Sequence, residues 1–242
     1  MQILKAEGVK KSFGGLAAVN NIDFDVEQGE IMGLIGPNGA GKTTFFNLIS
    51  GAHQVDSGTI VFKGTKISGR SPHQICRLGI GRTFQTAKNF PGMSVRENAI
   101  MGALFGKRRQ SRSQSEREVD QILEFVGLAD KGERCVPDLT LAGQKRVEVA
   151  RALATKPSLL MLDETMAGLN PTEVEDAMEL VRKIRDTGIT VIMIEHVMKA
   201  IMSICDRIVV LHHGARIAVG TPEEISSNSA VVEVYLGAGS RE

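Results

Sequence analysis

The feature that most constrains this chain is a glycine-rich string between an apolar run and a helical stretch. Residues 36–43 match the pattern G-x-x-x-x-G-K-[ST], directly after an apolar run that ends at Ile35 and directly before a helical stretch, residues 43–50. Glycines in such a string let the backbone turn its N–H groups inward around an anion, and the following helix adds the positive end of its dipole. The string therefore predicts a phosphate-binding loop.

The side chains of this loop indicate which ligand it would hold. Lys42 can bring a mobile positive charge to the β- and γ-phosphates of ATP, and Thr43 can offer an oxygen ligand to Mg²⁺. The alternative interpretation is a tight turn without a ligand. The residues that we expect to contact the nucleotide from this side are Gly36, Pro37, Asn38, Gly39, Ala40, Gly41, Lys42, Thr43 and Thr44.

Charge and cysteine content argue against several other classes of protein. The 242 residues include 29 Lys and Arg against 28 Asp and Glu, so a formal charge of +1 provides no overall field to attract nucleic acid or an anionic bilayer. Three widely spaced cysteines form neither a disulfide framework nor a zinc pattern and suit a reducing compartment. No apolar run approaches the roughly 20 residues that cross a bilayer, and we expect no signal peptide. We expect a cytoplasmic protein that reaches a membrane only through partners.

Apolar runs that alternate with helical stretches predict a layered α/β fold. Continuous apolar runs are typical of strands covered on both faces, and we expect a mostly parallel core sheet, flanked by helices, from four of them. These four runs are residues 30–36, 159–163, 190–195 and 207–211.

Two further parts are predicted around this core. Alternating apolar and polar residues in the first thirty positions and at 57–64 predict an N-terminal antiparallel β subdomain. Helical spacing over 95–104, 116–126 and 144–154 predicts an inserted helical subdomain. We expect one domain over residues 1–242, with a nucleotide-binding α/β core at 1–90 and 156–242 and the helical subdomain at 91–155.

Two carboxylates end one of the expected core strands. Asp163 and Glu164 follow Leu162 at the carboxyl end of that strand, which is where ligands bind in open α/β sheets. Asp163 can hold Mg²⁺ through its water shell, and Glu164 can orient and deprotonate an attacking water. Alone, the pair would be read as charges that cap a strand; together with the phosphate-binding loop it predicts nucleotide hydrolysis.

These motifs, in this order, resemble the ATP-binding subunits of ATP-binding cassette (ABC) transporters over essentially the whole chain. Gly81-Arg-Thr-Phe-Gln85 is similar to the Q-loop of that family, and Ile194-Glu-His196 to its switch-histidine segment. The resemblance implies that Gln85 contacts Mg²⁺ or the attacking water and that His196 contacts the γ-phosphate. Lys11-Ser-Phe13 resembles the segment that stacks on adenine, with Phe13 either the platform or packed in its strand. The implied fold is the P-loop NTPase fold of the ABC type.

The family's signature, commonly Leu-Ser-Gly-Gly-Gln, departs from its usual form here. One register of the segment aligns Gln144 with the family's Gln and removes the hydroxyl. The other, which we prefer because it needs no gap beside a helix, puts Thr140 at the Ser position as a helix N-cap. Two smaller departures are Thr165 in place of the usual Pro and Asn170 in place of a common Asp. The resemblance implies that the nucleotide bound by another subunit is contacted by Thr140, Leu141, Ala142 and Gly143.

Several strings, among them Ala167-Gly-Leu-Asn-Pro and the tail Glu233-Val-Tyr-Leu-Gly, resemble the branch that serves branched-chain amino-acid uptake. The implied protein is the ATP-hydrolysing subunit of an importer on the cytoplasmic side of the inner membrane. It would work as a homo- or heterodimer with two ATP molecules sandwiched between the subunits. Its other partners would be integral membrane permeases and, indirectly, a periplasmic or extracellular solute-binding protein.

Other functions remain open at this stage. The importer could carry another small solute, such as urea or an amide. A soluble cassette ATPase acting in DNA repair or translation, a P-loop kinase and a nucleotide-binding module that does not hydrolyse ATP are further alternatives.

Overall fold

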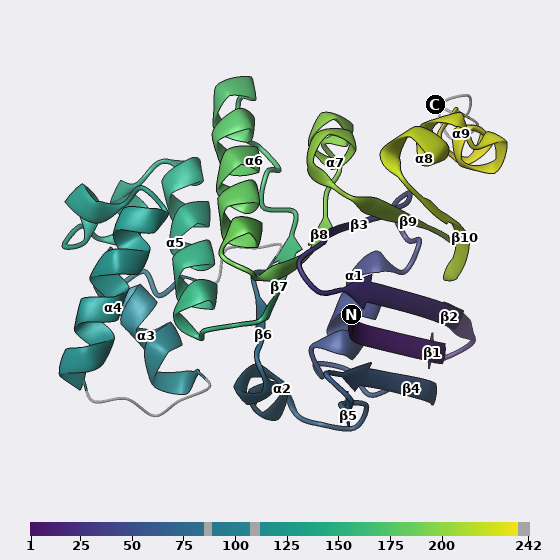
Figure 1. The fold of residues 1–242 in the computed structure, drawn as a ribbon, viewed down its shortest axis with the longest axis horizontal. Helices are drawn as coiled ribbons and strands as arrows, with labels where there is room; N and C mark the ends of the chain where they lie inside the picture. Colours follow the sequence, from purple (N-terminus) through teal and green to yellow (C-terminus); the bar gives the residue numbers. More distant parts are fainter. Residues whose placement is uncertain (85–88, 107–111, 237–242) are drawn as a thin grey trace. The chain divides into compact units, whose positions relative to one another are not determined.

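The computed structural model describes residues 1–84, 89–106 and 112–236, and the chain divides into two compact units. The first unit comprises Met1–Pro72 and Thr190–Glu242, and the second comprises His73–Ile189. Figure 1 labels their helices and strands. Within the described ranges, no helix combines the length and the apolar character needed to span a membrane.

The first unit contains the predicted antiparallel sheet, with strand order β2-β1-β4-β5. β1 pairs antiparallel with both β2 and β4, so the prediction for the first thirty residues and for 57–64 is confirmed. Phe24 of this sheet contacts Phe45 of helix α1 edge to face, with ring centroids 5.2 Å apart. The bounds are β1 Gln2–Phe13, β2 Leu16–Glu27, β4 Ser57–Phe62, β5 Thr65–Lys66 and α1 Lys42–Ile49.

The same unit contains three of the four predicted core strands. β3 pairs parallel with β8 on one side and with β9 on the other, and every residue of β3 and β8 is buried, as their continuous apolar sequences predict. The edge strand β10 pairs antiparallel with β9 and was not predicted. The bounds are β3 Ile31–Ile35, β8 Thr190–Ile194, α7 Met198–Ile204, β9 Arg207–His212, β10 Ala215–Gly220, α8 Pro222–Ser227 and α9 Ser229–Leu236.

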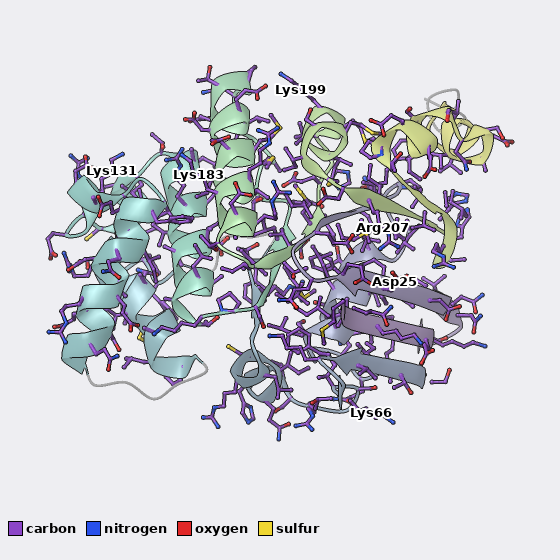
Figure 2. All side chains as sticks on the ribbon, viewed as in Figure 1. Asp25, Lys66, Lys131, Lys183, Lys199 and Arg207 are labelled. Carbon is purple, nitrogen blue, oxygen red and sulfur yellow. The ribbon has the colours of Figure 1, made fainter. Side chains whose placement is uncertain are left out.

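An ion pair joins the antiparallel sheet to the core strands of this unit. Arg207, the first residue of β9, donates from both terminal nitrogens to Asp25 Oδ2 on β2, each at 3.1 Å (Figure 2). Glu30 accepts a further, longer hydrogen bond from Arg207 at 3.4 Å. The side chain of Arg207 thus links the two sheets of the unit at one end.

The second unit combines two parallel strands with a group of helices. β7, the fourth predicted core strand, pairs parallel with β6, and helices α3, α4 and α5 contact one another in the predicted helical segment (Figure 1). α4 and α5 begin at residues 112 and 141, a few positions before the expected 116 and 144. The bounds are α2 Pro72–Leu78, β6 Ile80–Arg82, α3 Val95–Phe105, α4 Arg112–Phe125, α5 Leu141–Ala154, β7 Leu159–Asp163 and α6 Pro171–Asp186, with short 3₁₀ turns at Ala129–Lys131 and Val136–Asp138.

The position of α6 is fixed at its start by a capping box. The side chain of Asn170 accepts from the backbone N–H of Glu173 at 3.0 Å, and the Glu173 carboxylate accepts from the N–H of Asn170 at 3.0 Å. Each interaction satisfies a backbone donor that a helix leaves without a partner at its first turn. Asn170 therefore has a structural function as the N-cap of α6.

Asn170→Ala should lower the free energy of unfolding by about 1 kcal/mol, because the first turn of α6 loses its side-chain acceptor. Asn170→Asp is the matched control: it keeps an acceptor at the cap and should cost much less. Urea denaturation followed by circular dichroism measures both. Equal losses for the two variants would show that the cap does not stabilise the helix.

Candidate functional site

The loop after β3 has the backbone conformation that the glycine-rich string predicts. Gly36, Gly39 and Gly41 adopt φ angles of 149°, 78° and 99°. A Cβ at Gly36 would lie 2.2 Å from the carbonyl oxygen of Leu211, and one at Gly41 would lie 2.3 Å from that of Ala18. Any side chain at these two positions would collide with neighbouring backbone. The glycines are therefore required for the loop to take this shape.

Lys42 lies inside the curve of this loop. Its ammonium donates to the carbonyl oxygens of Gly36 at 2.6 Å and Pro37 at 3.0 Å, and only 6% of the residue is exposed. Phosphate oxygens are stronger acceptors for an ammonium than neutral carbonyls, because they carry charge. Lys42 is thus placed to exchange the two carbonyls for a phosphate group.

Helix α1 starts at Lys42 with no side-chain cap, because its N-cap residue is Gly41. Its first turn contains no acidic residue, so the positive end of the helix dipole is not offset locally. Thr43 is exposed and Thr44 is half-buried in this turn. Backbone N–H groups, a lysine and a hydroxyl therefore gather at the start of α1, an arrangement that suits an anion.

Phe13 ends β1 in the same unit and is 45% exposed. His53 contacts its ring edge to face, with centroids 5.3 Å apart, and Lys11 Nζ lies 5.5 Å from its centroid. An exposed ring of this kind can stack on a flat ligand, whereas a ring packed in the strand could not. The exposure favours the platform interpretation of Phe13.

His196 follows β8, also in the first unit, and its side chain is exposed. Glu195 beside it is buried. The end of β8 thus presents the imidazole outward while the preceding carboxylate faces inward. Gln85, the other residue predicted from the resemblance alone, lies outside the described residues.

The carboxylates at the end of β7 belong to the second unit. Asp163 is 1% exposed and accepts from Arg82 Nη2 at 2.9 Å, and its backbone N–H donates to Thr83 Oγ1 at 3.1 Å. A buried carboxylate needs a cationic or hydrogen-bonding partner, and Arg82 supplies it. Sequence reasoning missed Arg82 and Thr83, although both stand in the string that was noted for Gln85.

Glu164, the next residue, turns the chain out of the strand. It has a φ of 51°, the left-handed conformation that non-glycine residues seldom adopt, and its carbonyl oxygen accepts from Lys145 Nζ at 2.7 Å. Backbone conformations of this kind are retained where the surrounding contacts impose them. Lys145 of α5 thus contributes one of the contacts that hold the Glu164 backbone in this conformation.

The predicted N-cap of α5 is confirmed. Thr140 Oγ1 accepts from the backbone N–H of Gly143 at 3.3 Å, and Thr140 is exposed. Leu141 is 45% exposed, Ala142 is half-buried and Gly143 is buried. Gln144 turns its side chain back to donate to the carbonyl of Leu139 at 3.1 Å. The exposed tip of the helix thus consists of a hydroxyl and backbone N–H groups, a second arrangement suited to an anion.

Each unit therefore contains some of the residues predicted for the site. Residues 36–44, Phe13 and His196 belong to the first unit, and Asp163, Glu164 and residues 140–143 belong to the second. Among the described residues, no group of three or more His, Cys, Asp or Glu side chains could hold a metal by itself.

Comparison with known proteins identifies the family of this chain. The sequence profile described as ABC transporter matches residues 19–167, and that of the branched-chain amino acid ATP-binding cassette transporter matches residues 215–240. The chain is 41% identical to the high-affinity branched-chain amino acid transport ATP-binding protein BraF of Pseudomonas aeruginosa, over 97% of this chain and 98% of that protein. It is 39% identical to the high-affinity branched-chain amino acid transport ATP-binding protein LivG of Escherichia coli K12, over 97% of this chain and 98% of that protein.

A solved structure shows the same fold. The ADP conformation of MJ1267, an ATP-binding cassette of an ABC transporter, aligns with a TM-score of 0.90 and 31% identity over 98% of this chain and 99% of that one. The predicted α/β fold of the ABC type is thus confirmed. The chain belongs to the ABC transporter family, in its branch of branched-chain amino acid transport ATP-binding proteins.

Proposed function

We propose that this chain is the ATP-hydrolysing subunit of a membrane importer for branched-chain or related amino acids. The observation that carries the proposal is the glycine loop, whose shape excludes side chains at Gly36 and Gly41 and whose curve contains the ammonium of Lys42. The amino-acid solute is supported by the printed functions of BraF and LivG.

Residues 36–44 would bind the triphosphate of ATP, and Phe13 would stack on its adenine. Lys42 would leave the carbonyls of Gly36 and Pro37 for the β- and γ-phosphates, while N–H groups of the loop and of the first turn of α1 hold the remaining oxygens. This exchange costs little because the ammonium keeps acceptors in both positions.

Mg²⁺ would be held by the Thr43 hydroxyl, the Asp163 carboxylate and the Gln85 amide, directly or through water. Each of these groups offers an oxygen atom, the kind of ligand that this ion prefers. Arg82 fixes one oxygen of Asp163, so the carboxylate is oriented before the ion arrives. When bound, the ion would neutralise charge on the phosphates.

Glu164 would act as the general base for hydrolysis. It would accept a proton from the attacking water while the oxygen of that water attacks the γ-phosphorus, and ADP would leave with the oxygen of the broken bond. His196 and Gln85 would contact the γ-phosphate and the water. The carbonyl hydrogen bond from Lys145 would keep the Glu164 backbone in place during this step.

Thr140, Leu141, Ala142 and Gly143 would contact the nucleotide of a second ATP-binding subunit. The exposed helix tip of α5 offers a hydroxyl and N–H groups that suit a γ-phosphate. Two such contacts would close a dimer around two ATP molecules, and hydrolysis would remove the bridging phosphate. Permease subunits would convert closure into uptake, and they would keep this chain at the cytoplasmic side of the membrane.

Glu164→Gln should reduce ATP hydrolysis by at least about 100-fold, because an amide cannot accept the proton, while ATP binding remains. Glu179→Gln, on the exposed face of α6, is the matched control and should hydrolyse ATP as the unmodified chain does. Phosphate release and ATP binding are measured on both. Hydrolysis at the normal rate in the Glu164→Gln variant would remove the base assignment.

Mixing two inactive variants should restore hydrolysis if the site is shared between two copies. Lys42→Ala removes the ammonium, and Thr140→Asp keeps the helix cap but repels the γ-phosphate. Each should be inactive alone, and a mixed dimer should contain one intact site, made of the loop of one chain and the helix tip of the other. Thr140→Ser, the control, should stay active. A mixture as inactive as its components would contradict the shared site.

The solute is tested on this chain reconstituted in liposomes with the permeases that co-purify with it and their binding protein. Binding protein loaded with leucine, isoleucine or valine should stimulate ATP hydrolysis, and binding protein offered urea or an amide should not. The opposite preference would assign the importer to the other solute. An ATPase rate that no permease changes would favour a soluble cassette ATPase.

A further inference from the structure

The start of helix α5 contacts the loop that follows Glu164. Lys145 Nζ donates to the carbonyl oxygen of Glu164 at 2.7 Å. Leu141 packs against Gly168, since a Cβ at Gly168 would lie 3.0 Å from Leu141 Cδ2. All four residues belong to the second unit. The helix end formed by residues 140–143 is therefore attached to the loop that begins at Glu164.

Leu141 and Lys145 can make these contacts together. They stand four positions apart in α5, so their side chains leave the same face of the helix. In the preferred register of the signature, Leu141 occupies the position of the first glycine of the usual motif. A glycine has no side chain with which to reach the loop. The departure from the usual signature thus gives this chain an additional link between the helix tip and the loop.

The carbonyl of Glu164 is the point at which the loop turns. It also accepts from the backbone N–H of Ala167 at 3.4 Å, and Glu164 itself adopts the left-handed φ of 51°. Residues keep such a conformation where neighbouring contacts impose it. Thr165 and Met166, which follow, are buried and hold the loop to the core. The hydrogen bond from Lys145 joins the same turn to α5.

α5 can carry a displacement from its tip to this turn. Its 14 residues form one continuous helix, whose hydrogen-bonded backbone moves as a single element. Lys145 lies about one and a half helical turns after Thr140, the residue that caps the tip. A contact that pulls or fixes the tip is therefore felt at Lys145, and through its ammonium at the peptide that follows Glu164.

We propose that Lys145 is a positioning residue for Glu164, through which contact between the tip of α5 and the nucleotide of a second subunit sets the position of the base in this chain's own site. The inference rests on the proposed function, in which residues 140–143 contact a nucleotide held by the other subunit. The nucleotide in one site would then promote hydrolysis in the other, through a helix that belongs to one chain.

Lys145→Met removes the hydrogen bond and keeps an unbranched side chain. We expect kcat for ATP hydrolysis to fall about ten-fold, the effect of losing a hydrogen bond from a charged group, while KM and the dissociation constant of ATP stay unchanged. Lys145→Arg keeps a charged donor and should restore most of the rate. Lys183→Met, which removes an exposed lysine of α6, is the matched control and should hydrolyse ATP as the unmodified chain does.

A double variant separates positioning of the base from a general loss of structure. If Lys145 acts through Glu164, adding Lys145→Met to Glu164→Gln should not lower the residual rate of hydrolysis further. Steady-state kinetics measures the rates, and ATP binding shows that each variant is folded. A further loss of the same size in the double variant would overturn the inference.

Mixed dimers of the Lys42→Ala and Thr140→Asp chains test the link to the second subunit. The Thr140→Asp chain supplies Glu164 to the one complete site, while its own helix tip repels a γ-phosphate and has no nucleotide to contact. The rate per complete site should therefore equal that of the Lys145→Met dimer. Adding Lys145→Met to the Thr140→Asp chain should not lower this rate, because the link is already idle, and a further loss would overturn the coupling.

The outcome for the unmodified chain distinguishes this inference from the proposed function. Equal kcat values for the unmodified chain and Lys145→Met would overturn the inference alone, because hydrolysis itself would be intact. An unmodified chain that binds ATP but does not hydrolyse it, or does not bind it, would overturn the proposed function as well.

Discussion

The close approach of two backbone carbonyls to the glycine loop is the constraint on which the rest of the site depends. Leu211, whose carbonyl faces Gly36, belongs to β9, and Ala18, whose carbonyl faces Gly41, belongs to β2. These strands are in different sheets of the first unit, so the loop keeps its shape only while both sheets are packed. The Phe24–Phe45 contact and the Arg207–Asp25 ion pair join the same elements. The packing of the two sheets therefore also determines the shape of the glycine loop in this unit.

In the second unit, a charged carboxylate lies at the end of the buried strand β7. Asp163 is almost fully buried, and an isolated carboxylate there would be costly. Arg82, on the neighbouring strand β6, offsets this cost and fixes the orientation of the carboxylate. The same strand end places Glu164 in a left-handed backbone conformation. We propose that the first unit supplies the phosphate-binding loop and His196, and that the second supplies Asp163, Glu164 and the tip of α5.

Much of this could be predicted from the sequence, because the relevant signals are local. The loop, the core strands and the Thr140 cap each follow from a few consecutive residues. Arg82 was missed because its partner lies 81 residues away and no local pattern connects them. β10 and α9 were missed because edge strands and short helices carry weak periodicity. The roles of Gln85, His196 and the helix tip of α5 stay predictions, because they depend on a nucleotide and a second subunit.

The most direct test of the account is a crystal structure of the Glu164→Gln chain grown with ATP and Mg²⁺. The account predicts a triphosphate enclosed by residues 36–44 of one copy, with Lys42 turned from the carbonyls of Gly36 and Pro37 to the phosphates. It also predicts that residues 140–143 of a second copy contact the γ-phosphate. A nucleotide bound away from the glycine loop, or one that each copy encloses alone, would contradict it.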